Sequence, residues 1–319
     1  MSNPPLTGKV AVVAGSARGA GRGIAAMLGA AGATVYCTAR SIEGHLSDPK
    51  RPETIDETAA LVTANGGEGI AVRIDHTIES EVERLFDRVR REQGRLDIMI
   101  NNVNADALYE WKPFWKMSLE KGRKIVETAI HAHIVNAHFA VPLMRKAKKG
   151  LIVEITDGDG LYYRGHLYYD LTKTNAIRLA TAFAYELRKQ NIAAVAVTPG
   201  FLRSEAVLDV LHVREENWRD AVPERPEFEE SETPFFAGRA IAALAADPQV
   251  MKKSGRVFNS HELAAEYGLT DVDGRRPNVW RFIAEKMPQF RYKKLDDVFY
   301  TYVDIDLEAY QKELASVIE

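Results

Sequence analysis

The chain has 319 residues, of which 46% are hydrophobic and 27% are charged, and its formal net charge is −3. A chain of this size and composition can bury a full core without disulfides or metal ions. The net charge argues against a nucleic-acid-binding protein, which is usually basic, and no apolar stretch reaches the roughly 20 residues of a membrane span.

Short apolar runs alternate with helix-periodic segments over the first two-thirds of the chain. The runs lack strict polar alternation, which is typical of strands buried on both faces of a sheet. Strands are expected at residues 10–14, 34–38, 70–74, 96–100, 151–155 and 193–197. Helices are expected at residues 23–31, 52–65, 80–93, 119–147 and 171–189. This order indicates successive βαβ units, and hence a parallel sheet with helices on both faces.

The pattern changes after residue 200. Residues 201–235 are charged, aromatic and interrupted by prolines, and we interpret them as a substrate lid. A helix at 236–246 and a short strand at 256–259 complete a domain that we place at residues 1–270. Residues 271–319 are interpreted as a C-terminal extension that packs on this domain or on a partner subunit.

Cysteine usage bears on the cellular compartment. The single cysteine, Cys37, lies in an apolar run, so no disulfide framework is expected. This usage fits a reducing, intracellular compartment. Residues 1–5 show neither the basic region nor the apolar region of a secretion signal. We therefore expect a cytoplasmic protein.

A glycine-rich turn links the first expected strand to the first expected helix. Its residues are Gly15, Ser16, Ala17, Arg18, Gly19, Ala20 and Gly21. A pyrophosphate binds at a helix N-terminus through backbone N–H groups, and glycine lets the ligand approach the backbone closely. The position after a strand and before a helix makes a dinucleotide site more plausible than a plain turn.

The end of the second strand distinguishes between two cofactors. A site for NAD usually has a carboxylate there, whereas a site for NADP offers an arginine to the 2′-phosphate. This chain has Arg40 and Ser41 at that position, and Arg18 lies in the glycine turn. NADP(H) is therefore favoured, with NAD(H) as the alternative if both arginines are simply solvated.

Four motifs follow one another along residues 7–260, namely the glycine turn, Asn101-Asn102, Tyr169-x-x-x-Lys173 and Pro199-Gly200. In this order they resemble the short-chain dehydrogenase/reductase family, in particular dehydrogenase/reductase member 1-type proteins and related bacterial reductases. The resemblance implies a single doubly wound Rossmann domain with a seven-stranded parallel sheet, assembled as a homodimer or homotetramer. It also implies hydride transfer between a nicotinamide and a small carbonyl or alcohol substrate.

Tyr169 and Lys173 are the expected catalytic pair. They are four residues apart and therefore share one helix face. An ammonium group favours the phenolate, so Lys173 would lower the pKa of Tyr169 and allow it to act as general acid and base. By resemblance, Lys173 would also hold the nicotinamide ribose. The simpler alternative is an incidental pair on an amphipathic helix.

The resemblance assigns further cofactor contacts to strand ends. Asn102 would lie by the adenosine, Asp75 would meet the adenine edge, and Ser204 would contact the carboxamide. A strand-end Asp or a helix-capping Ser is also common without a ligand. The remaining predicted contacts are His76, Pro199 and Gly200.

The chain departs from the family at three places. Val103 and Asn104 replace smaller residues beside the cofactor, and Asp157 stands where the family has its catalytic serine. A carboxylate accepts a hydrogen bond but cannot donate one, and its charge would raise the pKa of the phenol. Asp157 is then protonated in a closed site, binds a substrate hydroxyl or amine, or faces solvent.

The third departure is Ala129, which replaces the helix asparagine of the family's catalytic tetrad. The polar residues that follow it could replace the proton relay or could be satisfied helix residues; they are His131, His133, Asn136 and His138. No metal site is expected, because the carboxylate arrangement of a histidine metal site is missing.

Two hypotheses follow. The first is an NADP(H)-dependent oxidoreductase that uses Tyr169 and Lys173, with an aromatic substrate pocket. Candidate lining residues, which could equally be core, are Tyr162, Tyr163, Phe201 and Trp218. The second is a non-catalytic dinucleotide-binding sensor or scaffold that has lost the serine and asparagine of the tetrad. The intact Tyr169–Lys173 pair favours the first hypothesis.

Overall fold

The computed structural model describes residues 3–47, 50–159 and 163–286. Within them, seven strands form one parallel sheet in the order β3-β2-β1-β4-β5-β6-β7. The strands are β1 Val10–Ala14, β2 Thr34–Ala39, β3 Glu68–Arg73, β4 Ile98–Asn101, β5 Gly150–Ile155, β6 Ile192–Thr198 and β7 Val257–Asn259. The predicted strands are all found with their ends within two residues, and the seven-stranded, doubly wound α/β fold is confirmed.

The α-helices of the described residues are α1 Gly19–Ala30, α2 Ile55–Ala64, α3 Glu79–Gln93, α4 Leu119–Val126, α5 Ala132–Ala147, α6 Leu167–Leu187, α7 Glu205–Val210, α8 Pro234–Ala246, α9 Ser260–Tyr267 and α10 Val279–Lys286. Helices occupy every predicted segment, whereas α7, α9 and α10 were not predicted, and α1 begins four residues before its predicted start. The helix predicted at 119–147 is divided by a π-helical turn at Glu127–His131, which contains Ala129. Helix α6 begins four residues before its predicted start, because the His166 ring caps it by accepting from the Tyr169 N–H.

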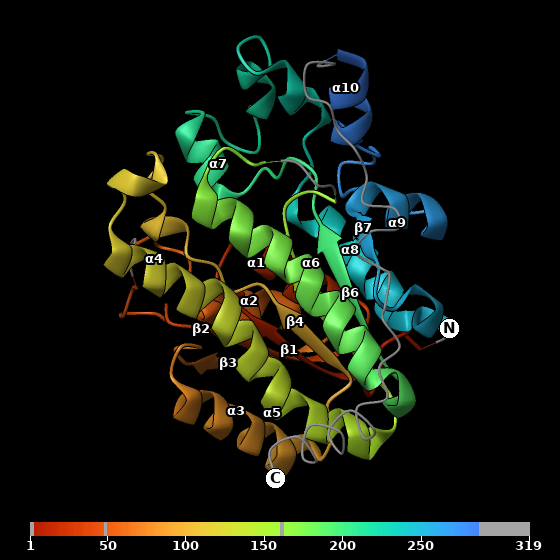
Figure 1. The fold of residues 1–319 in the computed structure, drawn as a ribbon. Coiled ribbons are helices and arrows are strands. Elements are labelled where there is room, and N and C mark those ends of the chain that lie inside the picture. Colours follow the sequence, from red (N-terminus) through yellow and green to blue (C-terminus); the bar gives the residue numbers. More distant parts are fainter. Residues whose placement is uncertain (1–2, 48–49, 160–162, 287–319) are drawn as a thin grey trace.

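The sheet is covered on both faces (Figure 1). Side chains alternate along each strand, so Ala11 and Val13 pack into the layer of α1, α2 and α8, whereas Val10 and Val12 pack against α3 and α5. Two apolar clusters result, one on each face of the sheet. Burial on both faces explains why the strands appear in the sequence as continuous apolar runs.

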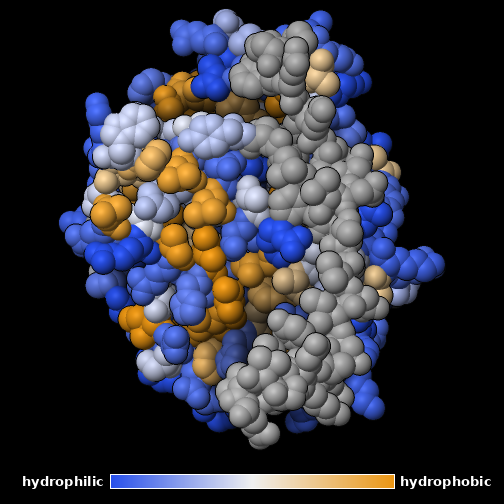
Figure 2. Space-filling view, in the orientation of Figure 1, coloured by the Kyte–Doolittle hydropathy of each residue, from blue (hydrophilic) through white to orange (hydrophobic). Residues whose placement is uncertain are grey.

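Apolar side chains also gather on the outer face of the layer formed by α4, α5 and α6 (Figure 2). Leu119 is 79% exposed, Ile134 41%, Leu167 41% and Leu171 46%. These four residues come from the three helices, so the exposed apolar surface crosses several elements. Among the described residues, no helix combines the length and the hydrophobicity needed to cross a membrane.

Residues 201–235 lie beyond the carboxyl end of β6, and ion pairs of Arg203 hold this segment in place. The Arg203 guanidinium is fully buried and binds the Glu215 and Asp273 carboxylates at 2.9 and 3.1 Å. Trp218, predicted as a possible pocket residue, is instead buried against Phe228 and does not line the cavity described below. Tyr162 lies outside the described residues.

The described part of the C-terminal extension contacts the same domain. Asp271 is buried and accepts hydrogen bonds from the backbone N–H and the hydroxyl of Thr233. Helix α10 contributes Val279, Trp280 and Ile283 to the wall of the cavity. Residues 287–319 lie outside the described residues.

Candidate active site

A cavity of about 1300 Å³ opens at the carboxyl end of the sheet. Small-molecule pockets measure about 300–1,000 Å³, so this one has room for a cofactor together with a substrate. The predicted residues that line it are Gly15, Arg18, Gly19, Ala20, Arg40, Ser41, Asp75, His76, Asn102, Asp157, Tyr169, Lys173, Pro199, Gly200 and Ser204. They meet here because the carboxyl ends of parallel strands share one edge of the sheet.

Ser16 and Gly21 do not line the cavity, although both were predicted to contact the cofactor. Ser16 is fully buried beneath the turn, with its hydroxyl 3.5 Å from the Thr38 carbonyl. Gly21 faces the inside of the turn, where a β-carbon would lie 2.1 Å from the Gly15 oxygen. Both residues therefore shape the turn from behind.

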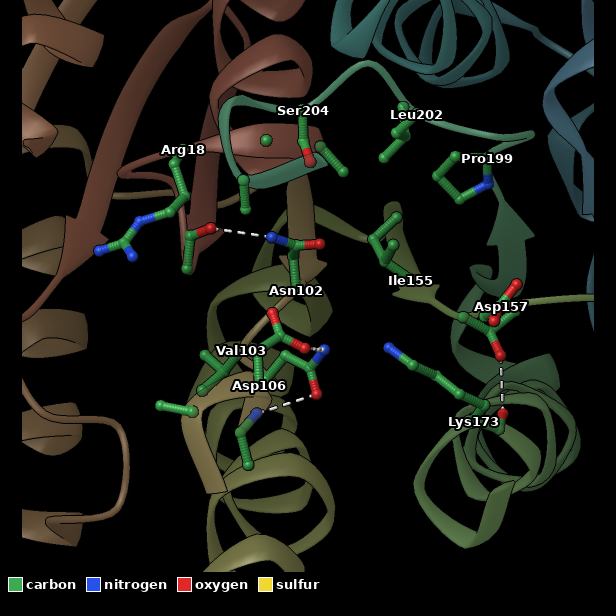
Figure 3. A pocket seen from close by; sticks show the side chains of 18 of the residues that line it. Arg18, Asn102, Val103, Asp106, Ile155, Asp157, Lys173, Pro199, Leu202 and Ser204 are labelled. Carbon is green, nitrogen blue, oxygen red and sulfur yellow. Dashed lines mark hydrogen bonds between the residues drawn. The ribbon is translucent and has the colours of Figure 1, made fainter. Parts of the chain in front are cut away.

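The glycine turn forms a cradle that packs so closely against the end of β4 that Gly15 has no room for a β-carbon. Gly15 has φ +80°, and a β-carbon there would lie 2.8 Å from the Asn102 oxygen. The Asn102 side chain donates to the Gly15 carbonyl at 2.8 Å, which ties the end of β4 to the turn (Figure 3). Closely approachable backbone at the start of α1 is the arrangement that binds a dinucleotide pyrophosphate, so these residues fit such a cofactor.

Glu205, a residue that was not predicted to contribute, contacts this cradle. Its Oε2 accepts a hydrogen bond from the Gly19 N–H at 2.8 Å, and its Oε1 lies 3.9 Å from Arg22. The carboxylate therefore uses a helix N-terminal donor of the kind that binds phosphate. Helix α7, which begins at Glu205, is also tied to the segment after β2, because Asp209 pairs with Arg51 at 2.8 Å.

Two arginines lie at the cofactor end of the cavity. Arg40 is about half exposed, with its guanidinium 3.7 Å from Asp75. Arg18 lies 3.7 Å from the Glu53 carboxylate. Ser41 bonds Ser47 through their hydroxyls at 2.6 Å. At 3.7 Å both ion pairs are longer than a hydrogen bond, so both guanidinium groups retain donors for a ligand phosphate.

The other predicted contacts have structural partners of their own. Asp75 accepts from the Thr77 N–H and hydroxyl at 3.0 and 2.7 Å. Ser204 caps α7 by accepting from the Val207 N–H at 3.4 Å. Both residues still line the cavity. Their positions are compatible with a cofactor contact, and the helix cap accounts for the choice of serine equally well.

Tyr169 and Asp157 are in direct contact at the other end of the cavity. The Tyr169 hydroxyl donates to Asp157 Oδ2 at 2.6 Å. Burial raises the pKa of Tyr169 most, and the charge of Asp157 and its hydrogen bond raise it further. The lowering expected from Lys173 is therefore outweighed, because burial and a neighbouring carboxylate both oppose the phenolate.

Lys173 extends into the cavity between Asp106 and Asp157 (Figure 3). Its Nζ lies 5.3 Å from the centre of the Tyr169 ring, so the two side chains share one helix face as predicted. Asp106 accepts from the Asn104 amide at 2.6 Å, and its charge also raises the pKa of Tyr169. Asn104, one of the bulkier replacements, thus holds a second carboxylate near the phenol.

His133 is part of a buried acid–imidazole pair. Its Nδ1 lies 2.6 Å from Glu154 Oε2, and its Nε2 lies 2.9 Å from the Val103 carbonyl. The other Glu154 oxygen accepts from the Asn101 amide at 2.6 Å. His133 is therefore a satisfied core histidine that supports the backbone next to the cavity. His131, in contrast, is 55% exposed.

The same network continues toward the cofactor end. The Asn136 amide donates to Asn101 at 3.0 Å, and its oxygen lies 2.8 Å from His76 Nδ1. Burial lowers the pKa of His76 to about 4, so the ring is neutral near pH 7. Its Nε2 lies 2.9 Å from the Thr38 hydroxyl. Both ring nitrogens of His76 are thus engaged inside the protein, although the residue touches the cavity.

Potential metal ligands and the Cys37 thiol are two further features of the described residues. Within residues 3–47, 50–159 and 163–286, no group of three His, Cys, Asp or Glu side chains is placed to hold a metal ion. Cys37 is buried, and burial raises the pKa of its thiol to about 12. This thiol is therefore a poor nucleophile at neutral pH.

Comparison with known proteins identifies the family. The short chain dehydrogenase family model matches residues 9–212. Mouse dehydrogenase/reductase SDR family member 1 is 36% identical over 278 residues, which cover 85% of this chain and 85% of that protein. A 3-oxoacyl-(acyl-carrier-protein) reductase of Synechocystis sp. is 27% identical over 257 residues, which cover 80% of this chain and 96% of that protein.

A solved structure supports the fold. The hydroxysteroid dehydrogenase of Escherichia coli superposes with a TM-score of 0.66 at 24% identity, covering 81% of this chain and 97% of that one. The chain therefore belongs to the short-chain dehydrogenase/reductase family, whose members are oxidoreductases that bind nicotinamide dinucleotides and act on small molecules. The resemblance inferred from the four motifs is confirmed.

Proposed function

We propose that the protein is an NADP(H)-dependent oxidoreductase that interconverts a carbonyl and an alcohol. The observation that carries this proposal is that Tyr169 and Lys173 share one helix face in the same cavity as the glycine cradle. When bound, the nicotinamide supplies the hydride, a hydrogen with two electrons, to the carbonyl carbon, or accepts it from the alcohol. Tyr169 supplies or removes the proton on the substrate oxygen, so the two half-reactions balance.

Each remaining residue has a distinct part in the proposal. Lys173 would hold the nicotinamide ribose, and the glycine turn would hold the pyrophosphate through its backbone N–H groups. Asp157 accepts the hydrogen bond of the Tyr169 hydroxyl in the absence of substrate. Tyr169 must therefore exchange this partner for the substrate oxygen during the reaction. Arg40 and Arg18 favour NADP(H), because a guanidinium matches the geometry of a phosphate.

The test is oxidation of NADPH against a panel of aldehydes and ketones by the wild-type protein and by Tyr169→Phe. Loss of general acid catalysis typically costs about 10²–10⁴-fold in rate, so we expect a decrease of that size in kcat. Tyr168→Phe is the matched control, because this neighbouring phenol lies on α6 but does not line the cavity. Its activity should match that of the wild type.

Two outcomes would contradict the proposal. Turnover that survives Tyr169→Phe would remove Tyr169 as the acid. Tight cofactor binding without turnover of any compound would instead favour the non-catalytic dinucleotide-binding protein considered above. Ala129 is buried in the π-helical turn and has no polar side chain that could act in a proton relay. This residue is the main support for the second hypothesis.

We further propose a homodimer or homotetramer in which the exposed apolar residues of α4, α5 and α6 meet a second copy of the chain (Figure 2). Contiguous exposed apolar surface of this kind is typical of an interaction site. Size-exclusion chromatography with light scattering tests this directly. The cytoplasmic location stays a prediction.

A further inference from the structure

One carboxylate oxygen of Asp157 has no hydrogen-bond partner among residues 3–47, 50–159 and 163–286. Its Oδ2 accepts from Tyr169, and within the described residues its side chain makes no other hydrogen bond and no ion pair. Arg164 binds the backbone oxygen of Asp157 at 2.6 Å but pairs its guanidinium with Asp170 at 2.7 Å. A half-buried carboxylate without an ionic partner is unfavourable, unless a ligand supplies that partner.

The charges around the Tyr169 phenol also favour a cationic ligand. Asp157 and Asp106 both act on Tyr169 and both oppose its ionised form. Lys173 is the cation that extends between these two carboxylates (Figure 3). The surroundings of the phenol are therefore net negative, and they disfavour the negative charge that develops on the phenol and substrate oxygens during proton transfer.

Aromatic side chains surround Tyr169, and one of them, Tyr163, lines the cavity. Tyr109 and Trp111 pack around Tyr169, with ring centres 5.2 and 5.7 Å from its own. Tyr163 lines the cavity and is 66% exposed. Carboxylates combined with aromatic faces are the usual surroundings of an organic cation in a protein.

We infer that the substrate carries a protonated amine next to its reacting carbon, and that Asp157 binds this ammonium group. The inference rests on the proposed oxidoreductase function. Because Asp157 and the Tyr169 hydroxyl touch, a substrate that binds both carries its nitrogen close to its oxygen, and adjacent carbons give the shortest such spacing. A vicinal amino alcohol, or the corresponding amino ketone, meets this condition, and no bond to the nitrogen changes in the reaction.

Binding of the ammonium group would also prepare the phenol for catalysis. The ammonium competes with Tyr169 for the Asp157 carboxylate, so the phenol hydrogen can turn to the substrate oxygen. Its positive charge offsets the two carboxylates that oppose the phenolate. The amine therefore contributes more in the transition state than in binding alone, and its loss should lower kcat as well as raise KM.

A neutral polyol is the main competing substrate class. Its hydroxyl could donate to the open Asp157 oxygen, but it would leave the negative charge around Tyr169 unbalanced. A protonated amine satisfies both the hydrogen bond and the charge. For this reason the structure favours the amine.

The experiment compares two alcohols of nearly equal shape, phenylethanolamine and ethyl phenyl carbinol, in which a methyl group replaces the ammonium group. With NADP⁺ as oxidant, we expect kcat/KM for the amine to be at least tenfold higher, with part of the difference in kcat. Asp157→Asn should remove this preference. Asp87→Asn, which changes a solvent-exposed aspartate on α3, should preserve it.

Calorimetry of phenylethanolamine binding to the enzyme with its cofactor gives a second readout. We expect the wild type to bind the amine at least tenfold more tightly than Asp157→Asn does. Cofactor affinity and thermal denaturation of both variants show whether a loss reflects misfolding. A preference for the neutral alcohol, or an amine preference that survives in Asp157→Asn, would overturn the inference.

These outcomes can be separated from a failure of the proposed function. If neutral carbonyls are turned over through Tyr169 but the amine is not preferred, the inference alone fails. If nothing is turned over, the proposed function fails, and the calorimetric comparison still decides whether Asp157 binds an ammonium group. Equal binding by the wild type and by Asp157→Asn would then reject the inference as well.

Discussion

The two ends of the cavity are built in different ways. At the cofactor end, Gly15, Gly19 and Gly21 belong to one continuous turn, and the geometry that a phosphate needs is local. At the substrate end, Asp157 follows β5 and Tyr169 lies in the first turn of α6, and they meet only after both elements pack. The glycine turn therefore depends only on its own few residues. The substrate end depends on contacts between distant residues, so one replacement, such as Asp157 for serine, can change its chemistry.

A buried hydrogen-bond network runs from His76 to Val103, two residues that line the cavity, and breaking it has the largest expected effect on stability. His133→Leu would leave the Glu154 carboxylate buried without its imidazole partner. Removing one member of a buried pair costs about 3–5 kcal/mol, so a marked decrease in the free energy of unfolding is expected. Chemical denaturation followed by circular dichroism measures it.

His131→Leu is the matched control for this variant. The residue is on the same stretch of helix but is 55% exposed, and its nearest carboxylate, that of Glu79, is 3.7 Å away. Surface substitutions usually change stability by less than about 0.5 kcal/mol. If both variants lost the same small amount of stability, the His133–Glu154 contact would not stabilise the fold beneath the cavity.

Much of the fold could be predicted from the sequence, because strands buried on both faces leave continuous apolar runs. The division of the segment 119–147 could not, since a π-helical turn preserves the apolar periodicity on either side of it. The start of α6 was also missed. Histidine is not among the preferred helix-capping residues, and the His166 ring caps this helix through a contact that only the folded chain shows.

The candidate site was also predictable only in part. Motif residues such as Gly15, Tyr169 and Lys173 could be recognised in the sequence, because the spacing within each motif is set by local geometry, and they line one cavity. Glu205 escaped prediction, since it contacts Gly19 across 186 residues of sequence. The direction of the Tyr169 pKa shift was also uncertain from the sequence, because it depends on the balance between burial, Asp157 and Lys173 in the folded protein.

Arg40→Ala tests the cofactor end, with an intermediate expected effect. Hydrogen bonds to charged groups contribute about 1.5–3 kcal/mol, and the half-exposed position of Arg40 places the expected value at the lower limit. We therefore expect about a tenfold loss of affinity for NADPH, with little change for NADH, which lacks the 2′-phosphate. Fluorescence titration with both cofactors measures this difference.

Arg84→Ala serves as the control, because this exposed arginine on α3 lies outside the cavity. It should leave both affinities unchanged. An equal loss for NADPH and NADH in Arg40→Ala would show that the residue contributes to general binding and does not select the 2′-phosphate. The distinction between a local cofactor site and an assembled substrate site would persist, but the preference for NADP(H) would lose its main support.

Glu205→Gln has the smallest expected effect and sharpens the comparison most, because Glu205 joins the segment 201–235 to the glycine turn. Its carboxylate occupies the Gly19 donor that an incoming phosphate would need, and two anions cannot share it. Charges at a helix N-terminus are worth about 0.3–1 kcal/mol, so the variant should bind NADPH about two- to fivefold more tightly. Glu216→Gln, an exposed neighbour in the same segment, should bind as the wild type does. Weaker binding by Glu205→Gln would mean that the carboxylate helps to hold the cofactor in place, and that the cofactor end, too, depends on a residue assembled from a distant part of the chain.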